Sequence, residues 1–422
     1  MHYVIIGNSA AGIGAAEGIR STGSQEEITI ITSEPHHTYS RPLISYLLQG
    51  KVSEEGMKYR ADSFYEDNRC TLINGTAVSV NPEDKSVTLS DGRKIPYGRL
   101  LVASGSLPFV PPAEGLDTVA EKHTFMSLDD AKRLGAAVDI NKKVLIIGAG
   151  LTGLKCAEGI SGRAGRITVL DLAPKILSSI LDDGGAELVK EHLERKGIEF
   201  ILSAGVSRFE KNTAVLENGD IIGFDILVLA AGARPDTSLL EGIAKTGRGI
   251  IINSKSETSA PGIYAAGDCT ESADVSSGQN RVMALLPNAY MQGECAGINM
   301  AGAESGEGSV KTIKNAVPMN AIGFFGLHII TAGTYTGEVY EENRTGLYKR
   351  LFYSGGRLNG CILIGDIRKA GIYTSLIRER TMLDTIDFSL ICRNPGLMAF
   401  TAKDRHIKLG GVNQYEYFSA ES

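Results

Sequence analysis

Val4-Ile5-Ile6-Gly7-Asn8-Ser9-Ala10-Ala11-Gly12 stands near the start of the chain, and Val144-Leu145-Ile146-Ile147-Gly148-Ala149-Gly150-Leu151-Thr152-Gly153 repeats its pattern later. Each copy is an apolar run that ends in a glycine-rich turn. Each is closed further on by a second apolar run that also ends in glycine, at 100–105 and at 227–232. One such turn is a weak signal, because glycine also serves helix packing. Two copies in the same context indicate two nucleotide-binding sites.

Composition narrows the class of protein. The 422 residues suffice for two or three domains, and 43% hydrophobic with 22% charged residues is ordinary for a globular protein. A net charge of −6 argues against nucleic acid as a partner. No apolar run approaches bilayer length, so we expect no membrane span and a cytoplasmic protein. The six cysteines lack CxxC spacing, which predicts neither a disulfide framework nor a metal site.

Both copies continue as strand, helix and strand, which is the pattern of a parallel sheet. A small antiparallel insert follows in each, next to Asp91-Gly92 in the first and Asn218-Gly219 in the second, and such dipeptides favour hairpin turns. An internal duplication explains the shared plan. The expected strands and helices are 2–6, 12–20, 28–32, 77–80 and 86–89 in the first copy, and 143–147, 152–161, 166–170, 206–210 and 213–216 in the second.

After residue 245 the chain does not begin a third copy. A buried strand ends in Gly267-Asp268, and a helix is expected from about Asn288 to Met300. From about residue 312 the pattern changes to short strands at 347–353 and 358–364, followed by a helix at 370–380. This indicates a third, smaller α+β domain, with a loose tail at the end.

The first glycine turn has the spacing of a dinucleotide site with one exception. Gly7 permits the tight turn and Gly12 lets the helix pack on the strand, but Ser9 stands where a glycine normally allows backbone to approach a pyrophosphate. Glu34 follows 22 residues after Gly12 (34 − 12), where an acid accepts ribose hydroxyls. Small residues that only pack a helix on a sheet are the alternative.

The second glycine turn is complete at Gly148, Gly150 and Gly153. Asp171 follows 18 residues later (171 − 153), after an apolar strand. A carboxylate there accepts a free 2′-hydroxyl and repels a 2′-phosphate, which favours NAD over NADP. Lys175 is nearby and could offset that preference.

These motifs, in this order over about residues 1–310, resemble the FAD- and NAD(P)-dependent pyridine nucleotide–disulfide oxidoreductase family. The resemblance implies an α/β fold class, with two Rossmann-like three-layer ββα domains and a C-terminal α+β domain. It implies an FAD-binding domain from 1–112 and 245–311, an NAD-binding domain at 113–244, an interface domain at 312–410 and a tail at 411–422. The helix beginning near Asn288 would direct its positive end at the flavin.

The resemblance also implies the cofactor contacts. Asp268 would bind the ribityl chain, and Arg41 would lie near the phosphates or that chain. The FAD set is Gly7, Ser9, Ala10, Ala11, Gly12, Glu34, Arg41, Pro42, Ala77, Ser104, Gly105, Gly267, Asp268, Asn288 and Ala289. The NAD set is Gly148, Gly150, Leu151, Thr152, Gly153, Asp171 and Gly232.

Within the family, 39–45 and 358–366 resemble the branch that holds rubredoxin reductases, the flavin part of NADH-dependent nitrite reductases and ferredoxin reductases. Thiol-active members carry cysteine near position 42, whereas this chain has Pro42 and no cysteine before Cys70. Ferredoxin reductases of oxygenase systems pair a lysine and a glutamate beside the flavin. Tyr46 and Lys155 stand there instead, and Lys155 either bonds the flavin or nicotinamide or extends to water.

Three functions remain in competition. The first is hydride transfer between NAD(H) and FAD, with single electrons passing to or from a small iron–sulfur protein, either rubredoxin or ferredoxin. The chain has no cysteine set for its own cluster, so that carrier is a separate partner. The second is an NADH oxidase, and the third is a flavoprotein subunit that docks on a larger complex. The C-terminal domain serves either homodimerisation or partner docking.

Overall fold

The computed structural model describes residues 2–305, 310–313 and 316–410. Its residues fall into two compact units. The first unit contains residues up to 273 and those from 279 to 316, and the second contains 274–278 and the residues from 317 onward. The expected tail at 411–422 lies outside the described residues.

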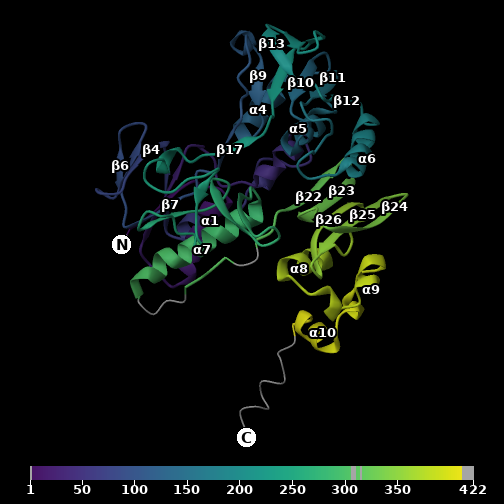
Figure 1. Ribbon diagram of the computed structural model, residues 1–422. Helices are drawn as coiled ribbons and strands as arrows, with labels where there is room; N and C mark the ends of the chain where they lie inside the picture. Colours follow the sequence, from purple (N-terminus) through teal and green to yellow (C-terminus); the bar gives the residue numbers. More distant parts are fainter. Residues whose placement is uncertain (1, 306–309, 314–315, 411–422) are drawn as a thin grey trace. The chain divides into compact units, whose positions relative to one another are not determined.

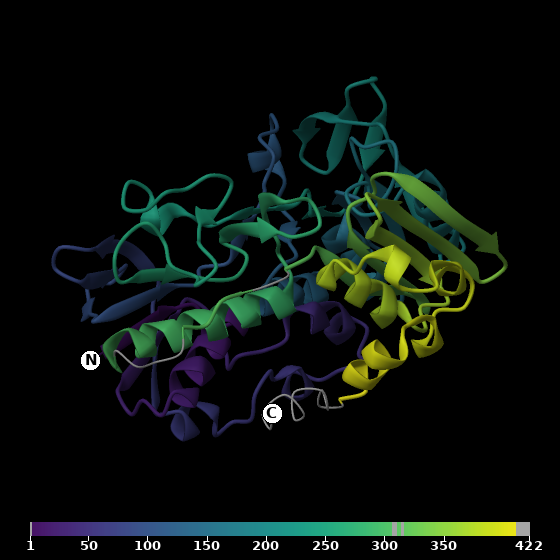
Figure 2. The same cartoon turned by 60° about the horizontal axis from the view of Figure 1, so that its bottom comes forward.

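The first unit opens with a five-stranded parallel sheet in the order β19-β7-β1-β2-β3. Its central strand β1 is apolar and buried on both faces, as a sheet covered on both sides requires. Helix α1 follows β1 and lies beside α7 (Figures 1 and 2). The bounds are His2–Ile6 (β1), Glu27–Thr32 (β2), Cys70–Asn74 (β3), Arg99–Val102 (β7), Ile263–Ala265 (β19), Ala10–Ser21 (α1) and Leu286–Ser305 (α7).

A second parallel sheet in the same unit repeats this plan in the order β12-β11-β10-β16-β9. Four strands of the two sheets correspond one to one: β7, β1, β2 and β3 in the first match β16, β10, β11 and β12 in the second. The fifth place is filled by β19, from late in the chain, in the first sheet and by β9 in the second. The bounds are Lys122–Thr124 (β9), Lys143–Ile147 (β10), Arg166–Leu170 (β11), Ile198–Ile201 (β12), Ile226–Leu229 (β16), Leu151–Ile160 (α5) and Asp183–Glu194 (α6).

Each parallel sheet carries a three-stranded antiparallel insert, β4-β5-β6 and β13-β14-β15. The sequence prediction placed only two strands in each. Asp91-Gly92 and Asn218-Gly219 lead into the third strand, because the turn between the first two strands falls at 82–85 and 211–212. The bounds are Ala77–Asn81 (β4), Ser86–Leu89 (β5), Lys94–Pro96 (β6), Val206–Glu210 (β13), Thr213–Leu216 (β14) and Ile221–Gly223 (β15).

The closing segments of the two copies pair with each other. Strand β8, Ser106–Pro108, lies antiparallel to β17, Ala233–Pro235. The Ser104 hydroxyl donates to the Asp236 carbonyl over 2.8 Å at the same place. The two nucleotide-binding halves are therefore joined immediately after their closing glycines.

The second unit contains a five-stranded antiparallel sheet in the order β22-β23-β26-β25-β24. Helices α8 and α9 pack on one face and bury Leu351, Cys361, Leu363, Tyr373 and Leu376. Sequence analysis found β25, β26 and α8 but not the first three strands. The bounds are Met319–Phe324 (β22), Leu327–Gly333 (β23), Glu338–Arg344 (β24), Leu347–Ser354 (β25), Arg357–Gly365 (β26), Ala370–Glu379 (α8), Phe388–Arg393 (α9) and Ala402–Lys408 (α10).

The remaining elements are short, apart from one helix. Helix α4 begins with a capping box, in which Ser127 and Asp130 each bond the other's backbone N–H. Among the described residues, none of the helices is long and apolar enough to span a membrane. The bounds are Ile44–Leu48 (α2), Phe64–Asp67 (α3), Leu128–Ala137 (α4), Ile250–Ile251 (β18), Thr270–Asp274 (β20) and Gln279–Val282 (β21), with 3₁₀ turns at 41–43, 55–57, 116–118, 238–240, 383–385 and 397–399.

Helices α1 and α7 approach closely enough that their backbones touch. A Cβ atom on Gly293 would lie 1.9 Å from the Ala11 carbonyl oxygen, and one on Gly297 would lie 2.2 Å from that of Ala15. Glycines on α7 therefore allow this contact, which holds the late helix against the first glycine turn.

We expect Gly297→Ala to lower the free energy of unfolding by about 1–3 kcal/mol, because the added methyl group must push two helices apart. Urea unfolding measures the change. Gly162→Ala is the matched control, since no atom lies within 4 Å of the Cβ it would add. Equal stability of the two variants would contradict the close packing.

Candidate functional site

The first glycine turn is locked to the ends of three strands. The Gly7 amide donates to the Ile31 carbonyl over 2.8 Å, and the Ala103 amide donates to that of Ile6 over 2.8 Å. Gly7 has a φ of +116°, and a Cβ there would lie 2.1 Å from the Ala103 carbonyl oxygen. A Cβ on Gly12 would lie 2.0 Å from the Gly7 carbonyl oxygen. These two glycines are required by the fold itself.

Ser9 is the N-cap residue of α1 and has an extended backbone, with φ of −105°. Its side chain makes no capping hydrogen bond, and the first turn of α1 contains no acidic residue. The positive end of the helix therefore keeps its amides for another acceptor. Ala10 and Ala11 form the buried first turn behind it.

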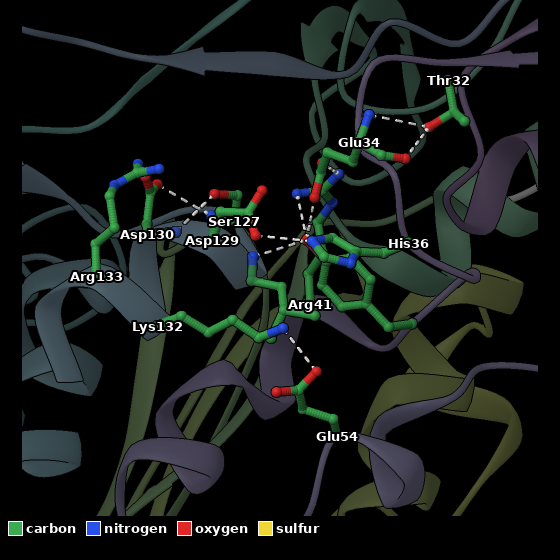
Figure 3. Close-up of polar contacts among 12 residues, drawn as sticks. Thr32, Glu34, His36, Arg41, Glu54, Ser127, Asp129, Asp130, Lys132 and Arg133 are labelled. Carbon is green, nitrogen blue, oxygen red and sulfur yellow. Dashed lines mark hydrogen bonds and ion pairs between the residues drawn. The ribbon is translucent and has the colours of Figure 1, made fainter. Parts of the chain in front are cut away.

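Glu34, the acid expected for ribose, lies in a polar cluster shown in Figure 3. Arg41 and Tyr39 bind one carboxylate oxygen each: the Arg41 guanidinium pairs with Oε1, and the Tyr39 hydroxyl donates to Oε2 over 2.6 Å. Burial raises the pKa of Tyr39, so the phenol stays protonated and remains a donor. Glu34 and Arg41 thus lie together, as two expected FAD residues should.

The same cluster reaches α4 in the second half of the unit. The Leu128 amide donates to the Tyr39 hydroxyl over 3.0 Å, and Arg41 donates to the Met126 carbonyl over 3.2 Å. Figure 3 also shows His36 bonded to Asp129, at 2.8 Å, and Lys132 paired with Glu54, at 2.7 Å. The segment after β2 therefore connects the first glycine turn to the start of α4.

Asp268 lies in the turn that follows β19, directly after Gly267. Burial raises the pKa of its carboxyl group, while the positive charge of Arg41 opposes that rise. Among the described residues no side chain or amide donates a hydrogen bond to this carboxylate. A buried acid with no donor is costly unless a ligand supplies one. Its proximity to Arg41 brings three expected FAD residues into one region.

Gln292 on α7 fixes the Gly267 turn, and sequence reasoning missed it. Its side-chain oxygen accepts from the Gly267 amide over 2.7 Å and from the Thr270 hydroxyl over 3.0 Å. Its amide nitrogen donates to the Ser272 hydroxyl over 3.2 Å. Gln292 is 3% exposed, so the network is shielded from water. A lone Gln in a helix gives no signal in sequence.

The other expected FAD residues are spread along the same half. Asn288 and Ala289 lie buried in the first turn of α7, and a Cβ on Gly267 would lie 3.6 Å from that of Ala289. Gly105 has a φ of +75° and follows β7 with Ser104. Pro42 is the second residue of the 3₁₀ turn that follows Ser40, and Ala77 begins β4.

A cavity of about 430 Å³ opens beside the second glycine turn. It gathers six of the seven expected NAD residues, and the seventh, Gly153, packs beneath them with its Cβ position 1.9 Å from the Gly148 carbonyl oxygen. A Cβ on Gly150 would meet no protein atom within 4 Å. This glycine therefore serves the cavity and not the packing. The six are Gly148, Gly150, Leu151, Thr152, Asp171 and Gly232.

Asp171 lies in the cavity wall and holds the turn in place. Its carboxylate accepts from the Ala149 amide over 2.6 Å and from the Ala173 amide over 2.7 Å. No lysine or arginine lines the described cavity. Lys175, the residue that could have offset the preference for NAD, pairs with Asp183 at 2.7 Å and is absent from the lining. The local charge favours a free 2′-hydroxyl.

Tyr46 and Lys155 lie together, as their shared motif positions suggest. The Lys155 ammonium lies 4.7 Å from the centre of the Tyr46 ring and pairs with Glu158. Glu158 is 3% exposed and lies one turn further along α5. Tyr46 and Glu158 thus both contact the Lys155 ammonium in the structure. The sequence analysis missed Glu158, because it lies outside the compared motif position.

The six thiols do not form a reactive centre. No disulfide links them, and burial raises the pKa of every one, to about 11 for Cys70, the least buried. A thiol with a raised pKa is a poor nucleophile at neutral pH. Within the described residues, no group of three or more His, Cys, Asp or Glu could hold a metal ion.

In comparison with known proteins, two stretches of the chain each match a protein family. Residues 1–293 match the family described as pyridine nucleotide-disulphide oxidoreductase, and residues 318–381 match the rubredoxin NAD+ reductase C-terminal domain. The crystal structure of NADH:rubredoxin oxidoreductase from Clostridium acetobutylicum is 25% identical, with a TM-score of 0.74, over 93% of this chain and 99% of that chain.

Three relatives are similar over most of the chain. The NADH-dependent phenylglyoxylate dehydrogenase subunit epsilon of Aromatoleum evansii is 31% identical, over 90% of this chain and 92% of its own length. An NADH oxidase of Methanocaldococcus jannaschii is 31% identical, over 88% and 89%. The nitrite reductase of Bacillus subtilis is 30% identical over 92% of this chain, which spans only 48% of that relative.

We expect Tyr39→Phe to destabilise the protein by about 1–3 kcal/mol, because the Leu128 amide loses its acceptor and Oε2 of Glu34 loses its donor. Thermal unfolding of the purified protein measures the loss. Tyr97→Phe is the control, since the buried Tyr97 hydroxyl has no partner among the described residues. A stability unchanged by Tyr39→Phe would contradict the connection to α4.

Proposed function

The chain belongs to the pyridine nucleotide-disulphide oxidoreductase family, and on this premise we propose that it exchanges electrons between NADH and a small iron–sulfur protein through FAD. Family members are FAD-dependent oxidoreductases that use NADH. The observation that carries the proposal is the pair of nucleotide-binding halves together with thiols that are all unreactive. Electrons must then leave for an external acceptor.

The residues of the first half fit FAD. The amides at the start of α1 are free to bind phosphate, with Ser9 offering its hydroxyl in place of the usual glycine. Two buried hydroxyl oxygens of this half, those of Thr38 and Ser45, have no partner among the described residues. Such groups indicate a polar ligand at this face.

Glu34 and Arg41 complete the proposed FAD site. Each Glu34 oxygen already accepts one hydrogen bond and has a lone pair left for a ribose hydroxyl. Arg41 pairs with Glu34 and its charge also acts on Asp268, so it would help to balance both carboxylates and the phosphates. The expected remaining contacts are Gly7, Ala10, Ala11, Gly12, Pro42, Ala77, Ser104, Gly105, Gly267, Asn288 and Ala289.

The cavity of the second half fits NAD(H). Its volume lies within the usual range for ligand pockets, and Gly150 leaves open space where a pyrophosphate would approach the backbone. Asp171 would accept the ribose hydroxyls. The cavity carries no cation for a 2′-phosphate among its described lining residues, which supports NADH over NADPH.

FAD, when bound, supplies the chemistry by taking two electrons as hydride and releasing them singly. The protein positions the rings and excludes water. Lys155 lies on α5, whose first residues line the NAD cavity. Tyr46 lies on α2, which follows Arg41 in the FAD half, and the two side chains are in contact. We place this pair at the meeting point of the two rings, where the ammonium would favour negative charge on the reduced ring.

A specific observation favours a second candidate. The relative of Aromatoleum evansii is by name a subunit of an NADH-dependent dehydrogenase, and this chain covers 92% of it. The chain would then be the NAD(H)-reactive subunit of a larger complex and receive electrons from a partner subunit. If the chain is such a subunit, the second unit would serve as the docking surface for the partner. If the chain instead acts with a small iron–sulfur protein, the second unit would serve as a homodimer contact.

Anaerobic stopped-flow spectroscopy tests the function. NADH should bleach the flavin absorbance at least 100-fold more efficiently than NADPH, in terms of the second-order rate constant, because Asp171 repels the 2′-phosphate. Rubredoxin or ferredoxin should then restore the absorbance rapidly. Alkylation of the protein with iodoacetamide beforehand should leave both phases unchanged, because its thiols are protonated.

The outcomes separate the alternatives. Reoxidation faster with oxygen than with either carrier would identify an oxidase. Slow reoxidation by every soluble acceptor, with tight co-purification of a large partner, would identify the subunit. Loss of the second phase on alkylation would contradict the thiol-independent route, and failure of NADH to bleach the flavin would overturn the function itself.

Asp268→Asn should weaken FAD binding at least tenfold while leaving the FAD-free protein as stable as the wild type or more so at pH 7. Burial raises the pKa of Asp268, so ionisation of this carboxyl group destabilises the FAD-free fold as pH rises above the unfolded value of about 4. The stability difference should vanish below that pH. Urea unfolding from pH 3.5 to 7 and FAD titration measure both effects, and a destabilised apo-variant at pH 7 would contradict them.

A further inference from the structure

We propose that the second unit carries a binding site for a small multivalent anion of the phosphate-ester class, separate from both dinucleotide sites. A cavity of about 300 Å³ lies where β24, β25 and β26 meet the loop before α8 and the end of α9. All of its lining residues belong to the second unit. The elements involved are labelled at the green and yellow end of the chain in Figure 1.

The cavity is strongly positive. Five basic side chains line it: Arg344, Lys349, Arg368, Lys369 and Arg393. The carboxylates that pair with them are Glu342, which serves both Arg344 and Lys349, and Asp366, which serves Arg368. Five positive charges against two negative ones leave a surplus of three, in a chain whose net charge is −6.

Lys369 and Arg393 contribute this surplus most directly. The Lys369 ammonium bonds the side-chain oxygen of Asn394, and Arg393 donates to the Ser389 hydroxyl over 2.9 Å. Both partners are neutral, so neither charge is compensated within the described residues of the cavity. Two uncompensated cations on one concave wall repel each other unless an anion lies between them.

Lys349 is the second sign of a built site, because it is buried. It is 5% exposed, and its ammonium donates to the Cys392 carbonyl over 2.7 Å beside Glu342. An ammonium has three N–H groups, and a buried charge needs partners for them. A ligand that enters the cavity would bring an acceptor to this group.

The start of α8 lies in the same wall. Its N-cap residue Lys369 has a left-handed backbone, with φ of +69°, and supplies no capping hydrogen bond from its side chain. The first turn of α8 has no acidic residue. The positive end of a ten-residue helix is thus directed at the cavity beside Tyr373. A β-carbon in this conformation is strained, which is typical of functional turns.

Size and charge define the ligand. A volume near 300 Å³ is at the lower end of ligand pockets and suits a small metabolite rather than a dinucleotide. Guanidinium groups bind phosphate with two parallel hydrogen bonds. The acidic face of a protein would reach the exposed Arg344 and Arg368, whose side chains are 69% and 85% exposed, but not the buried Lys349.

Isothermal titration calorimetry with inorganic pyrophosphate tests the site. The full chain, loaded with FAD and saturated with NAD+, keeps the probe out of the two dinucleotide sites. At low salt without divalent cations we expect a Kd of 1 mM or tighter. The variant Lys369→Glu/Arg393→Glu should weaken binding at least tenfold, and both residues are exposed, so the fold should persist.

Arg378→Glu/Lys403→Glu is the matched control, since it changes the charge of the same unit equally at exposed positions outside the cavity. It should bind pyrophosphate within threefold of the wild type. Equal weakening by both variants, or no binding by the wild type, would overturn the proposal. So would a cavity variant that still binds pyrophosphate but loses tenfold in kcat/KM for rubredoxin, because the surface would then be a protein-docking site.

Discussion

The contact between each glycine turn and the strand that closes its half is the constraint on which the first unit depends. Gly7 touches the Ala103 carbonyl and Gly148 touches that of Ala230, and both have a φ of +116°. The supporting hydrogen bonds are the same in both copies, from Ala103 to Ile6 and from Ala230 to Ile147, at 2.8 Å each. A side chain at either glycine would separate helix from sheet, and the helix amides would then no longer point at a phosphate.

The two copies differ where ligand chemistry, and not folding, sets the residue. Ser9 and Gly150 have nearly the same backbone conformation, with φ of −105° and −81°, so the fold accepts a side chain at both. The acids differ as well. Asp171 holds its own glycine turn through the Ala149 amide, whereas Glu34 is held by Tyr39 and Arg41. The acid of the NAD site is thus held by its own glycine turn. The acid of the FAD site is held by the segment with Tyr39 and Arg41, which also contacts α4.

Periodicity and glycine spacing were enough to predict both strand–helix–strand units and the long helix α7, because these elements are apolar and continuous. They could not predict β9, the fifth strand of the second sheet, which has only three residues. The buried strand expected before Gly267-Asp268 does correspond to β19, but its place in the first sheet could not be read from the pattern. Nor could they predict β6 and β15, which are equally short. In the second unit, β24 was missed because most of its residues are exposed and polar, so that no apolar pattern marks it as a strand.

Site residues that belong to a spaced motif could likewise be predicted, whereas isolated site residues could not. Motif spacing gathered six of seven NAD residues in one cavity, but Gln292 and Glu158 were invisible, because a single polar residue in an apolar helix has no pattern. Tyr39 was quoted only as part of a resemblance, yet it is the residue through which Glu34 reaches α4. Contacts between distant segments decide such roles, and a lone sequence does not record them.

Lys155 shows how an electrostatic contact can be kept while its connectivity changes. Its carboxylate partner, Glu158, lies on the same helix, so this ion pair cannot join α5 to α2. The Tyr46 ring links the charge to the other half, and such a contact is weaker than a buried ion pair. Close packing adds to this contact: a Cβ on Gly159 would lie 3.2 Å from the Ser45 carbonyl oxygen and 3.3 Å from Leu48. Helices α5 and α2 thus meet through close packing as well as through the contact between a cation and an aromatic ring.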